Sequence, residues 1–380
     1  MAKKAYIGVN NVARKIKKGY IGIDGVARKI KKAYIGIGGV ARPCWSSGVE
    51  YYGPITPLSV GRYYLAATTV GDYALFGGGQ IANITYSDAV DAYDKSLQKY
   101  TGTIEPLSVA RYQVAATTVG DYALFGGGGA YKNPDSQITV DAYNKSLTKY
   151  TGTIELSEGR SHCGATTVGD YALFGGGGNT STVEAYNKSL TKYTGTIEQL
   201  SDIKRCPAAT TVGDYALFGS SSNFGAGAYM LDAYNKSLTK YAGTTEPFSE
   251  IRLPISATTV GDYALFGGGD NSLPCDSLEA YNKSLQKYTG TIEPLSVARF
   301  RLAATTVGDY ALFGGGDGAV SGCGTLVEAY NESLQKYTDT ITPLSVGRYC
   351  LAATTVGDYA LFAGGRGGGA AQDAVDVYAV

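Results

Sequence analysis

An all-β fold made of seven copies of one unit is predicted by three features of this 380-residue sequence. The run Val70-Gly-Asp-Tyr-Ala-Leu-Phe-Gly-Gly-Gly79 returns seven times in closely similar form. The aspartate at its third place recurs at intervals of 49, 49, 44, 48, 47 and 49 residues, at Asp72, Asp121, Asp170, Asp214, Asp262, Asp309 and Asp358. A period near fifty, with an apolar run that ends in glycines, is typical of the blades of a β-propeller. We therefore expect residues 49–380 to form seven blades and residues 1–48 to form a separate head.

Each unit divides into four expected antiparallel strands, which the second unit shows most clearly. Residues 114–119 are small and β-prone, Gly120-Asp121 is a two-residue hairpin signal, and residues 122–125 form a second strand that ends in glycines. A third strand is expected at 140–143 and a fourth at 149–154, with Asn144-Lys-Ser as the turn between them. Residues 122–125 lack polar alternation, which indicates a sheet buried on both faces between neighbouring blades.

These residues resemble the kelch repeat, with a strand that ends in Gly-Gly, a downstream tyrosine in Val-Asp-Ala-Tyr-Asn, and an arginine that opens the next unit. Where the kelch family usually has a tryptophan on the fourth strand, this chain has Tyr100, Tyr150, Tyr193, Tyr241, Tyr288 and Tyr337. The resemblance covers residues 49–380 and implies a seven-bladed kelch-like β-propeller. It implies no particular activity.

The last unit lacks a fourth strand of its own, because its third strand at 374–378 is followed only by two residues. Residues 50–55 align with residues 99–104 at an offset of 49. We therefore expect this N-terminal strand to close the ring, which would leave no unpaired strand edge in the last blade.

The head contains a shorter repeat of 14 residues. Its three copies of Tyr-Ile-Gly are each followed by a turn pair, at Asn10-Asn11, Asp24-Gly25 and Gly38-Gly39, and then by Val-Ala-Arg. Such pairs favour hairpins, so we expect a small β-meander, with a small solenoid as the alternative. Pairing across Asn10-Asn11 would create one largely apolar face, which holds Arg14 together with Ala5, Ile7, Val9, Val12 and Ile16. A thin sheet of this kind needs a second copy or a larger assembly to cover it.

Charge divides the chain into a basic head and an acidic remainder. Residues 1–42 hold eight lysines and three arginines against Asp24, a net charge of +10, so residues 43–380 carry −10. A bipolar chain suits docking by its basic end, although a solvated basic face explains the pattern equally well. The head also resembles N-terminal repeats of tail-type proteins from phages and prophages of Gram-positive gut bacteria. That resemblance implies contact of residues 1–45 with a virion tail component or with a second copy of this chain. We expect no nucleic-acid partner and no membrane insertion.

The repeats differ mainly at one end of the expected ring. The loops after the second strand and the residues that open the first strand vary, whereas the Gly-Asp and Asn-Lys-Ser turns are nearly constant. Drift of surface loops would produce such variation by itself. The strand openings, however, are rich in aromatic and cationic residues, which suit a binding surface. We expect a site for a cell-surface glycan or protein formed by Tyr63, Tyr64, Tyr112, Gln113, His162, Arg205, Phe300, Arg301 and Tyr349.

A cation stands six residues before the Thr-Thr pair of every unit, at Arg62, Arg111, Arg160, Lys204, Arg252, Arg299 and Arg348. A ring of cations could bind an anionic sugar or carboxylate. We favour a structural role, in which each cation pairs with a carboxylate or with carbonyls of a neighbouring blade, because the residue repeats in every unit.

The sequence contains no catalytic or cofactor motif, and we expect no cofactor and no metal. Kelch enzymes of the galactose oxidase type hold copper with histidines and tyrosines, and a single histidine, His162, cannot assemble that site. His162, Cys163, Cys206 and Cys350 lack the spacing of a metal motif, and the six cysteines stand singly, which argues against a disulfide framework. No nucleophile elbow or phosphate loop is found.

These features predict a non-enzymatic binding or adhesion module, and most specifically a phage or prophage tail-associated receptor-binding protein. The alternatives are a cytoplasmic kelch scaffold for protein–protein interaction and, less favoured, a carbohydrate-active enzyme. The first repeat follows Met1 without a signal peptide, and no apolar run is long enough to span a bilayer. We therefore expect synthesis in the cytoplasm, followed by incorporation into a virion tail or release by lysis.

Overall fold

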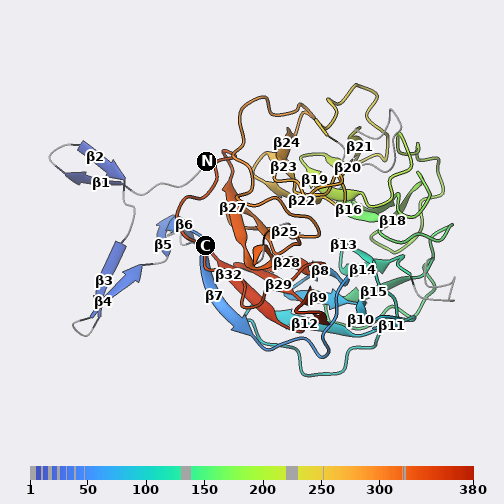
Figure 1. Cartoon of the computed structure of the whole chain (residues 1–380), viewed down its shortest axis with the longest axis horizontal. Helices are drawn as coiled ribbons and strands as arrows, with labels where there is room; N and C mark the ends of the chain where they lie inside the picture. The colour runs from blue at the N-terminus through green and yellow to red at the C-terminus, as the bar shows by residue number, and fades with distance from the viewer. Residues whose placement is uncertain are drawn as a thin grey trace.

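The computed structural model describes residues 48–129, 138–219, 230–250, 252–318, 320 and 322–380. Their side chains are described too, except that of Cys323. Before residue 48, only the backbone of six strands is described. Strands supply the regular structure of these ranges, apart from one short 3-10 helix, η3 (Cys323–Thr325). The predicted all-β class is therefore confirmed. Figure 1 shows small sheets grouped around a common centre, with the first strand of each sheet innermost.

The repeats form seven antiparallel sheets, which we number in chain order. Their strands are, for sheet 1, β8 (Ala66–Val70), β9 (Tyr73–Gly77) and β12 (Val90–Asp94); for sheet 2, β13 (Ala115–Val119), β14 (Tyr122–Gly126) and β15 (Val140–Asn144); for sheet 3, β16 (Gly164–Val168), β17 (Tyr171–Gly175) and β18 (Val183–Asn187); for sheet 4, β19 (Ala208–Val212), β20 (Tyr215–Gly219) and β21 (Asp232–Asn235); for sheet 5, β22 (Ser256–Val260), β23 (Tyr263–Gly267) and β24 (Leu278–Asn282); for sheet 6, β25 (Ala303–Val307), β26 (Tyr310–Gly314) and β27 (Val327–Asn331); and for sheet 7, β28 (Ala352–Val356), β29 (Tyr359–Ala363), β32 (Val375–Ala379) and β7 (Glu50–Ile55). Two ribbons extend loops of sheets 1 and 7, namely β10 (Gln80–Ala82) with β11 (Thr85–Tyr86) and β30 (Arg366–Gly367) with β31 (Ala370–Ala371).

A two-residue Gly-Asp turn joins the first two strands of each sheet. In sheet 2, Val119 pairs with Tyr122 across this turn, and Gly120 has a φ of 56°. Glycine adopts this left-handed conformation at little cost. A Cβ at Gly120 would also lie 3.0 Å from the Lys188 Cβ atom of sheet 3. The turn therefore requires glycine both for its own backbone and for the close approach of the next sheet.

The core lies between neighbouring sheets. Phe125 of sheet 2 is fully buried and packs on Gly77 of sheet 1, where a Cβ would lie 2.7 Å from the phenyl ring. Val70 and Leu75 of sheet 1 belong to the same buried cluster as Phe125. The second strands lack polar alternation because both of their faces are covered.

The innermost strands contact one another in a cycle: β8, β13, β16, β19, β22, β25 and β28 follow in order, and β28 contacts β8. Threonine hydroxyls connect them. Thr68 Oγ1 lies 2.8 Å from Thr118 Oγ1, and Thr118 donates to the Thr69 carbonyl at 2.7 Å, so Thr68 is the donor in the first bond. The same two bonds join each sheet to the next, and those between sheets 7 and 1 complete the cycle. The threonines line a channel of about 490 Å³.

The N-terminal strand completes sheet 7, as expected. β7 pairs antiparallel with β32 from Ile55 opposite Val375 to Glu50 opposite Ala379. The Tyr51 hydroxyl donates to the buried Asp376 carboxylate at 2.6 Å. Two segments at least 320 residues apart in the sequence are thereby held side by side (Figure 1).

The expectation of a fourth strand in the other six sheets is wrong. The run after each third strand makes a tyrosine–lysine bridge beside the turn, such as Tyr143 with Lys149, and in sheet 2 a second bridge, Thr139 with Glu155, but no named strand. In these sheets the connecting turn fixes the register at that bridge. No turn connects β32 to β7. Here Tyr378 lies opposite Tyr51, one residue beyond Glu50, which is the residue that corresponds to the bridging lysine of the other sheets; a bulge lies beside this pair. Because no short turn restricts its register, β7 pairs with β32 along its whole length.

The head strands pair as three hairpins: β1 (Tyr6–Val9) with β2 (Val12–Lys15), β3 (Gly19–Ile23) with β4 (Val26–Ile30), and β5 (Lys32–Ile37) with β6 (Val40–Ser46). Val9 pairs with Val12 and Ile7 with Arg14, which is the register expected across the first turn pair. No ladder joins one hairpin to the next among these described strands, so the expected meander is not formed. Lys17-Lys18, where its second turn was placed, lies outside the described residues; two lysines do not favour the positive φ that tight hairpins need.

Candidate functional site

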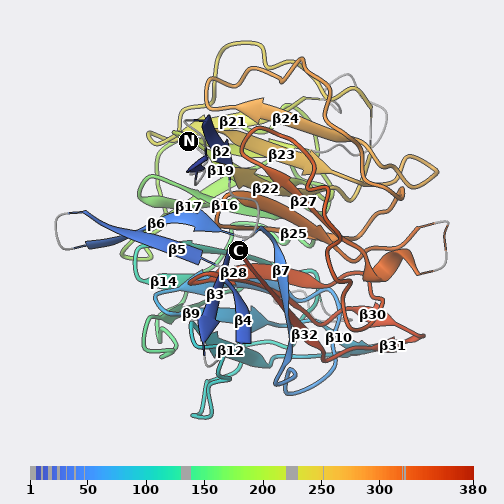
Figure 2. The ribbon, with the colours of Figure 1, turned by 90° about the vertical axis from the view of Figure 1, so that its left-hand side faces the viewer.

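The two ends of the ring of sheets differ. The Gly-Asp turns lie at one end, and the variable loops and strand openings lie at the other; in the side view of Figure 2, the β30–β31 ribbon marks the variable end. Ala379 pairs with both Glu50 and Tyr359, and Tyr359 directly follows a Gly-Asp turn. The chain therefore enters the ring at the constant end, opposite the variable loops.

A cavity of about 290 Å³ opens at the centre of the variable end, and we call it the mouth cavity. Of the predicted site residues, Tyr64, Gln113 and His162 line it. The rest of its lining is Leu65, Val114, Cys163, Cys206, Pro207, Pro254, Ile255, Cys350 and Leu351, drawn from sheets 1 to 5 and sheet 7. The predicted residues of different repeats thus converge on one cavity.

The other predicted residues surround the mouth cavity. Tyr63, Tyr112, Phe300 and Tyr349 each form a backbone bridge to the start of the adjacent variable loop. They stand one residue before the cavity positions and are partly or largely buried. Arg301 and Arg205 do not line the cavity, and Arg205 is exposed. It precedes Cys206, and the side chain that reaches the cavity from sheet 4 is the thiol.

Five residues at the mouth have backbones in the left-handed region, with φ between 55° and 58°: Tyr64, Gln113, His162, Arg301 and Cys350. Side chains larger than glycine rarely adopt this conformation. Backbone hydrogen bonds hold it, because Cys350 donates to Arg301, Tyr64 to Cys350, Gln113 to Tyr64 and His162 to Gln113, at 2.9 to 3.1 Å. Strained residues that the surrounding structure enforces are found preferentially at functional sites.

Aromatic rings and guanidinium groups form the rim. Arg301 lies over the rings of Phe300 and Tyr349, with its guanidinium carbon 5.0 and 5.9 Å from their centroids. Arg366 lies 5.5 Å from the Tyr63 ring. Tyr112 stacks on Tyr86 of β11 with centroids 4.9 Å apart and planes 7° apart. Such rims combine rigid apolar area with charge.

The mouth cavity itself carries no charge near neutral pH. Burial, helped by the nearby Arg301 guanidinium, lowers the pKa of His162 to about 4. Burial raises the pKa of the Cys206 and Cys350 thiols to about 11. The pKa of Tyr64 is raised by burial and then by the Cys350 thiol. Charge at this end therefore comes from the rim.

The repeated cations do not form an anion site. Each is buried and paired with a carboxylate on the third strand of its own sheet, not of a neighbouring one as expected: Arg62–Asp91 (2.6 Å), Arg111–Asp141 (2.7 Å), Arg160–Glu184 (2.5 Å), Lys204–Asp232 (3.4 Å), Arg252–Glu279 (3.1 Å), Arg299–Glu328 (2.5 Å) and Arg348–Asp376 (2.8 Å). The segment that carries the cation also contacts the same carboxylate: in sheet 1, the Ser59 amide and hydroxyl donate to Asp91 beside Arg62.

A second cation strengthens most of these pairs. In sheet 1, Lys99 lies 2.9 Å from Asp91, on the side opposite Arg62. Burial alone would raise the pKa of Asp91, but the Arg62 and Lys99 charges outweigh it and hold the pKa below its ordinary value. Such a carboxylate stays ionised and tied to the fold, so it is not available to a ligand.

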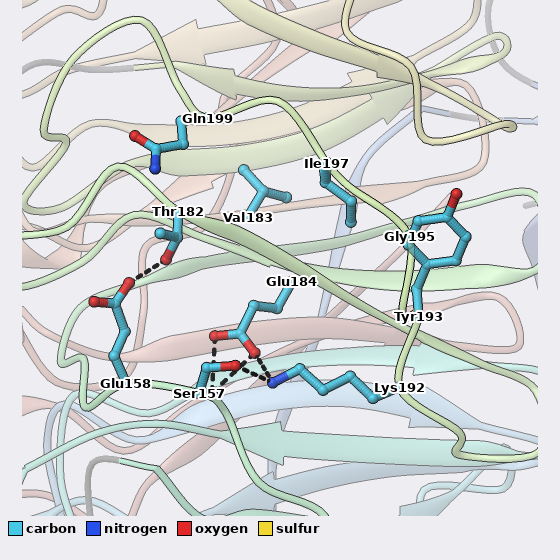
Figure 3. A pocket seen from close by; sticks show the side chains of 10 residues that line it. All are labelled: Ser157, Glu158, Thr182, Val183, Glu184, Lys192, Tyr193, Gly195, Ile197 and Gln199. Atoms are coloured by element: carbon cyan, nitrogen blue, oxygen red, sulfur yellow. Dashed lines mark hydrogen bonds and ion pairs between the residues drawn. The ribbon is translucent and has the colours of Figure 1, made fainter.

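A second cavity, of about 420 Å³, lies beside β18, the third strand of sheet 3 (Figure 3). Figure 3 shows the Glu184 carboxylate directed at Lys192 and Ser157, and Glu158 directed at Thr182. Glu158 also pairs with Arg160 at 3.5 Å. Because its charged side chains already pair with one another, this cavity offers a ligand less than the mouth cavity does.

Tyr86, Cys206, Pro254, Cys350 and Arg366 also lie at the mouth. They belong to the strand openings and variable loops expected to form the binding face, but they were not among the residues named for the site. Cys206, Pro254 and Cys350 stand two residues after the repeated cation, the same place as Tyr64, Gln113, His162 and Arg301. That shared offset was the available signal. Tyr86 and Arg366 belong to variable loops that were expected at the binding end, but no pattern within the sequence singled out these two positions.

Cys163, Cys206, Cys275 and Cys350 are free thiols. Among the residues with described side chains, no group of three or more histidine, cysteine and acidic residues could hold a metal ion. The described part of the chain also contains no helix long and apolar enough to cross a membrane.

No protein-family model matches this chain, and no curated protein sequence matches it. Its function must therefore be inferred from the geometry of its own residues.

Proposed function

We propose that the seven sheets are the blades of a kelch-like β-propeller and that the chain is a non-enzymatic binding protein. The closed cycle of contacts between innermost strands supports the propeller, because a cycle of seven sheets leaves no open end in the array. The pairing of β7 with β32 is consistent with closure of this kind.

The observation that carries the binding function is the mouth cavity with its aromatic and cationic rim. Large apolar cavities with a few convergent polar groups are the usual ligand sites of proteins. Five strained backbones direct residues from different sheets to this place. The side chains around it vary between repeats, whereas the turns at the opposite end are nearly constant.

In its specific form, the proposal is a phage or prophage tail-associated receptor-binding protein that recognises a surface glycan or protein. The polarity of the ring supports it, because the basic head joins at the constant end and leaves the mouth cavity facing away. A protein that attaches by one end and recognises by the other requires this arrangement.

The test compares two double variants of the full-length protein. Tyr112→Ala with Phe300→Ala alters the rim. Lys145→Ala with Lys188→Ala alters the constant end, where these exposed lysines pair with Asp121 and Asp170. Binding to an array of bacterial surface polysaccharides and the melting temperature are measured for each. The rim variant should bind about tenfold more weakly or worse, because buried aromatic anchors contribute roughly 2 kcal/mol each, while the control stays within about twofold.

Loss of binding in the control alone would place recognition at the other end of the ring. Failure to bind any polysaccharide, together with absence of the protein from purified tail particles labelled with its antibody, would exclude the tail-associated function. It would leave the protein–protein scaffold as the better explanation.

A further inference from the structure

Arg301 differs from the repeated arginines in having no carboxylate partner. Among the described residues no ion pair includes Arg301, although its side chain is only partly exposed and is held over two aromatic rings. Asp317, on the loop of the same sheet, instead accepts a hydrogen bond from the Gly318 amide at 3.0 Å. A guanidinium fixed in this way is preorganised to bind an anion, because little side-chain freedom remains to be lost.

The neutral interior beside Arg301 limits the ligand to a small number of charges. His162 and the thiols of Cys206 and Cys350 line a space of about 290 Å³ and are uncharged near neutral pH. A ligand with several negative groups would leave most of them without a cation inside the cavity, which is costly. Of the rim guanidinium groups, Arg301 is the one whose charge acts on all three of these side chains, whereas Arg366, over Tyr63, acts only on Cys350. A single anionic group beside the cavity therefore matches Arg301.

The polar groups of the cavity favour a ligand with several hydroxyls. The Tyr64 hydroxyl, the Gln113 amide and the neutral His162 imidazole can each donate and accept hydrogen bonds. Pro207, Pro254 and Ile255 supply apolar walls between them. An acidic amino-acid side chain would satisfy Arg301 but would offer no hydroxyl to the interior groups, whereas a sugar ring offers hydroxyls to all three.

We propose that the mouth cavity binds one sugar ring that carries a single carboxylate, with the carboxylate on Arg301 and the ring hydroxyls on Gln113, His162 and Tyr64. This proposal rests on the function proposed above and names the chemical class of its ligand. Planar guanidinium groups bind carboxylates through two parallel hydrogen bonds, so the position of the carboxylate on the ring would set specificity.

The test uses the full-length protein and monosaccharide probes in NMR titrations. Glucuronate, galacturonate and N-acetylneuraminate represent carboxylated sugars. Glucose and the methyl ester of glucuronate lack the negative charge. At least one carboxylated sugar should bind about tenfold more tightly than glucose and the ester, because a charge-assisted hydrogen bond is lost in both. Arg301→Gln should remove this preference. Arg301→Lys should retain part of it, because the charge remains and the bidentate geometry does not.

Lys236→Gln removes the same charge at the constant end and should leave the preference unchanged, and melting temperatures establish that each variant folds. Equal binding of charged and uncharged sugars, or an Arg301→Gln protein that keeps the preference, would overturn the proposal. Binding of a Gly-Glu-Gly peptide without binding of any carboxylated sugar would overturn it in favour of a protein ligand. A further outcome is that the protein binds only neutral glycans on the array and loses that binding in the double variant Tyr112→Ala with Phe300→Ala. That result would support the proposed function but exclude carboxylated sugars as the ligand class.

Discussion

Two arginines two residues apart in the chain have different surroundings. Arg299 is buried, pairs with Glu328 at 2.5 Å and holds sheet 6 together. Arg301 lies at the mouth over two aromatic rings without a carboxylate. Residue type therefore does not distinguish the structural cation from the one that we propose binds a ligand. The backbone does, because Arg299 pairs with its own third strand, whereas Arg301 itself has a left-handed backbone conformation at the mouth.

His162 should make the protein less stable in mild acid. Its pKa is about 4 in the folded protein and about 6.5 when unfolded. The unfolded state therefore binds the proton first, so the contribution of neutral His162 is complete above pH 6.5 and is lost as pH falls toward 4. The loss should approach about 3 kcal/mol at pH 4.

Chemical denaturation at pH 7 and pH 4 measures this effect for the native protein and for His162→Gln, which keeps a hydrogen-bonding side chain without the titration. The variant should lose less stability than the native protein over this interval. Carboxylates such as Asp91 titrate in both proteins, so the difference isolates the histidine. Identical losses would show that His162 is not buried as the structure places it.

Part of the candidate site could be predicted at the residue scale. Tyr64, Gln113 and His162 were identified because they differ between otherwise similar repeats. Their left-handed backbones were not predictable, since none is glycine or asparagine, the residues whose presence signals a positive φ. The structural pairing of Arg62 was predicted from its repetition, but not its partner, because strand contacts between distant residues decide that.

At the element scale, the repeat period and the turn signals predicted most strands. The Gly-Asp hairpins formed where expected, because glycine at a fixed place specifies the turn locally. The expected fourth strands did not form as ladders in six sheets, because register depends on the connecting turn and not on strand composition. Closure by β7 was predictable from a count of strands alone.

β7 should be required for a stable ring. We compare a chain that begins at residue 48 with one that begins at residue 57, since both lack the head and only the second lacks β7. The shorter chain loses the Tyr51–Asp376 hydrogen bond and the buried Val49 side chain, and it exposes the edge of β32. Burial of Val49 alone is worth roughly 1.5–3 kcal/mol, and an unpaired edge promotes aggregation.

Thermal unfolding and light scattering should therefore show a lower melting temperature and aggregation for the chain that begins at residue 57. The chain that begins at residue 48 serves as the matched control for removal of the head. Equal melting temperatures and equal solubility would mean that β7 does not contribute to closure.

At the scale of the whole molecule, the separation of charge along the chain matches the difference between the two ends of the ring. Residues 1–42 carry a net charge of +10 and the remainder carries −10, and the chain passes from one to the other at the constant end of the ring. The mouth cavity is at the far end. The head can therefore dock on another surface without covering the mouth cavity, which is what attachment combined with recognition requires.

The head should drive association of the full-length protein or its binding to a virion tail component. Its strands form two-stranded hairpins without a ladder between them in the described residues, and isolated hairpins are marginally stable in water. Mass photometry should show oligomers for residues 1–380 and a monomer for residues 48–380. Salt distinguishes electrostatic association from association by strand pairing or apolar contact. At 1 M salt the screening length falls to about 3 Å, so contacts made by the basic residues should dissociate. Strand pairing or apolar contact should persist. A full-length protein that is monomeric at low salt and binds no tail component would remove the attachment role from the head, and with it the strongest reason to connect the polarity of the ring to a virion.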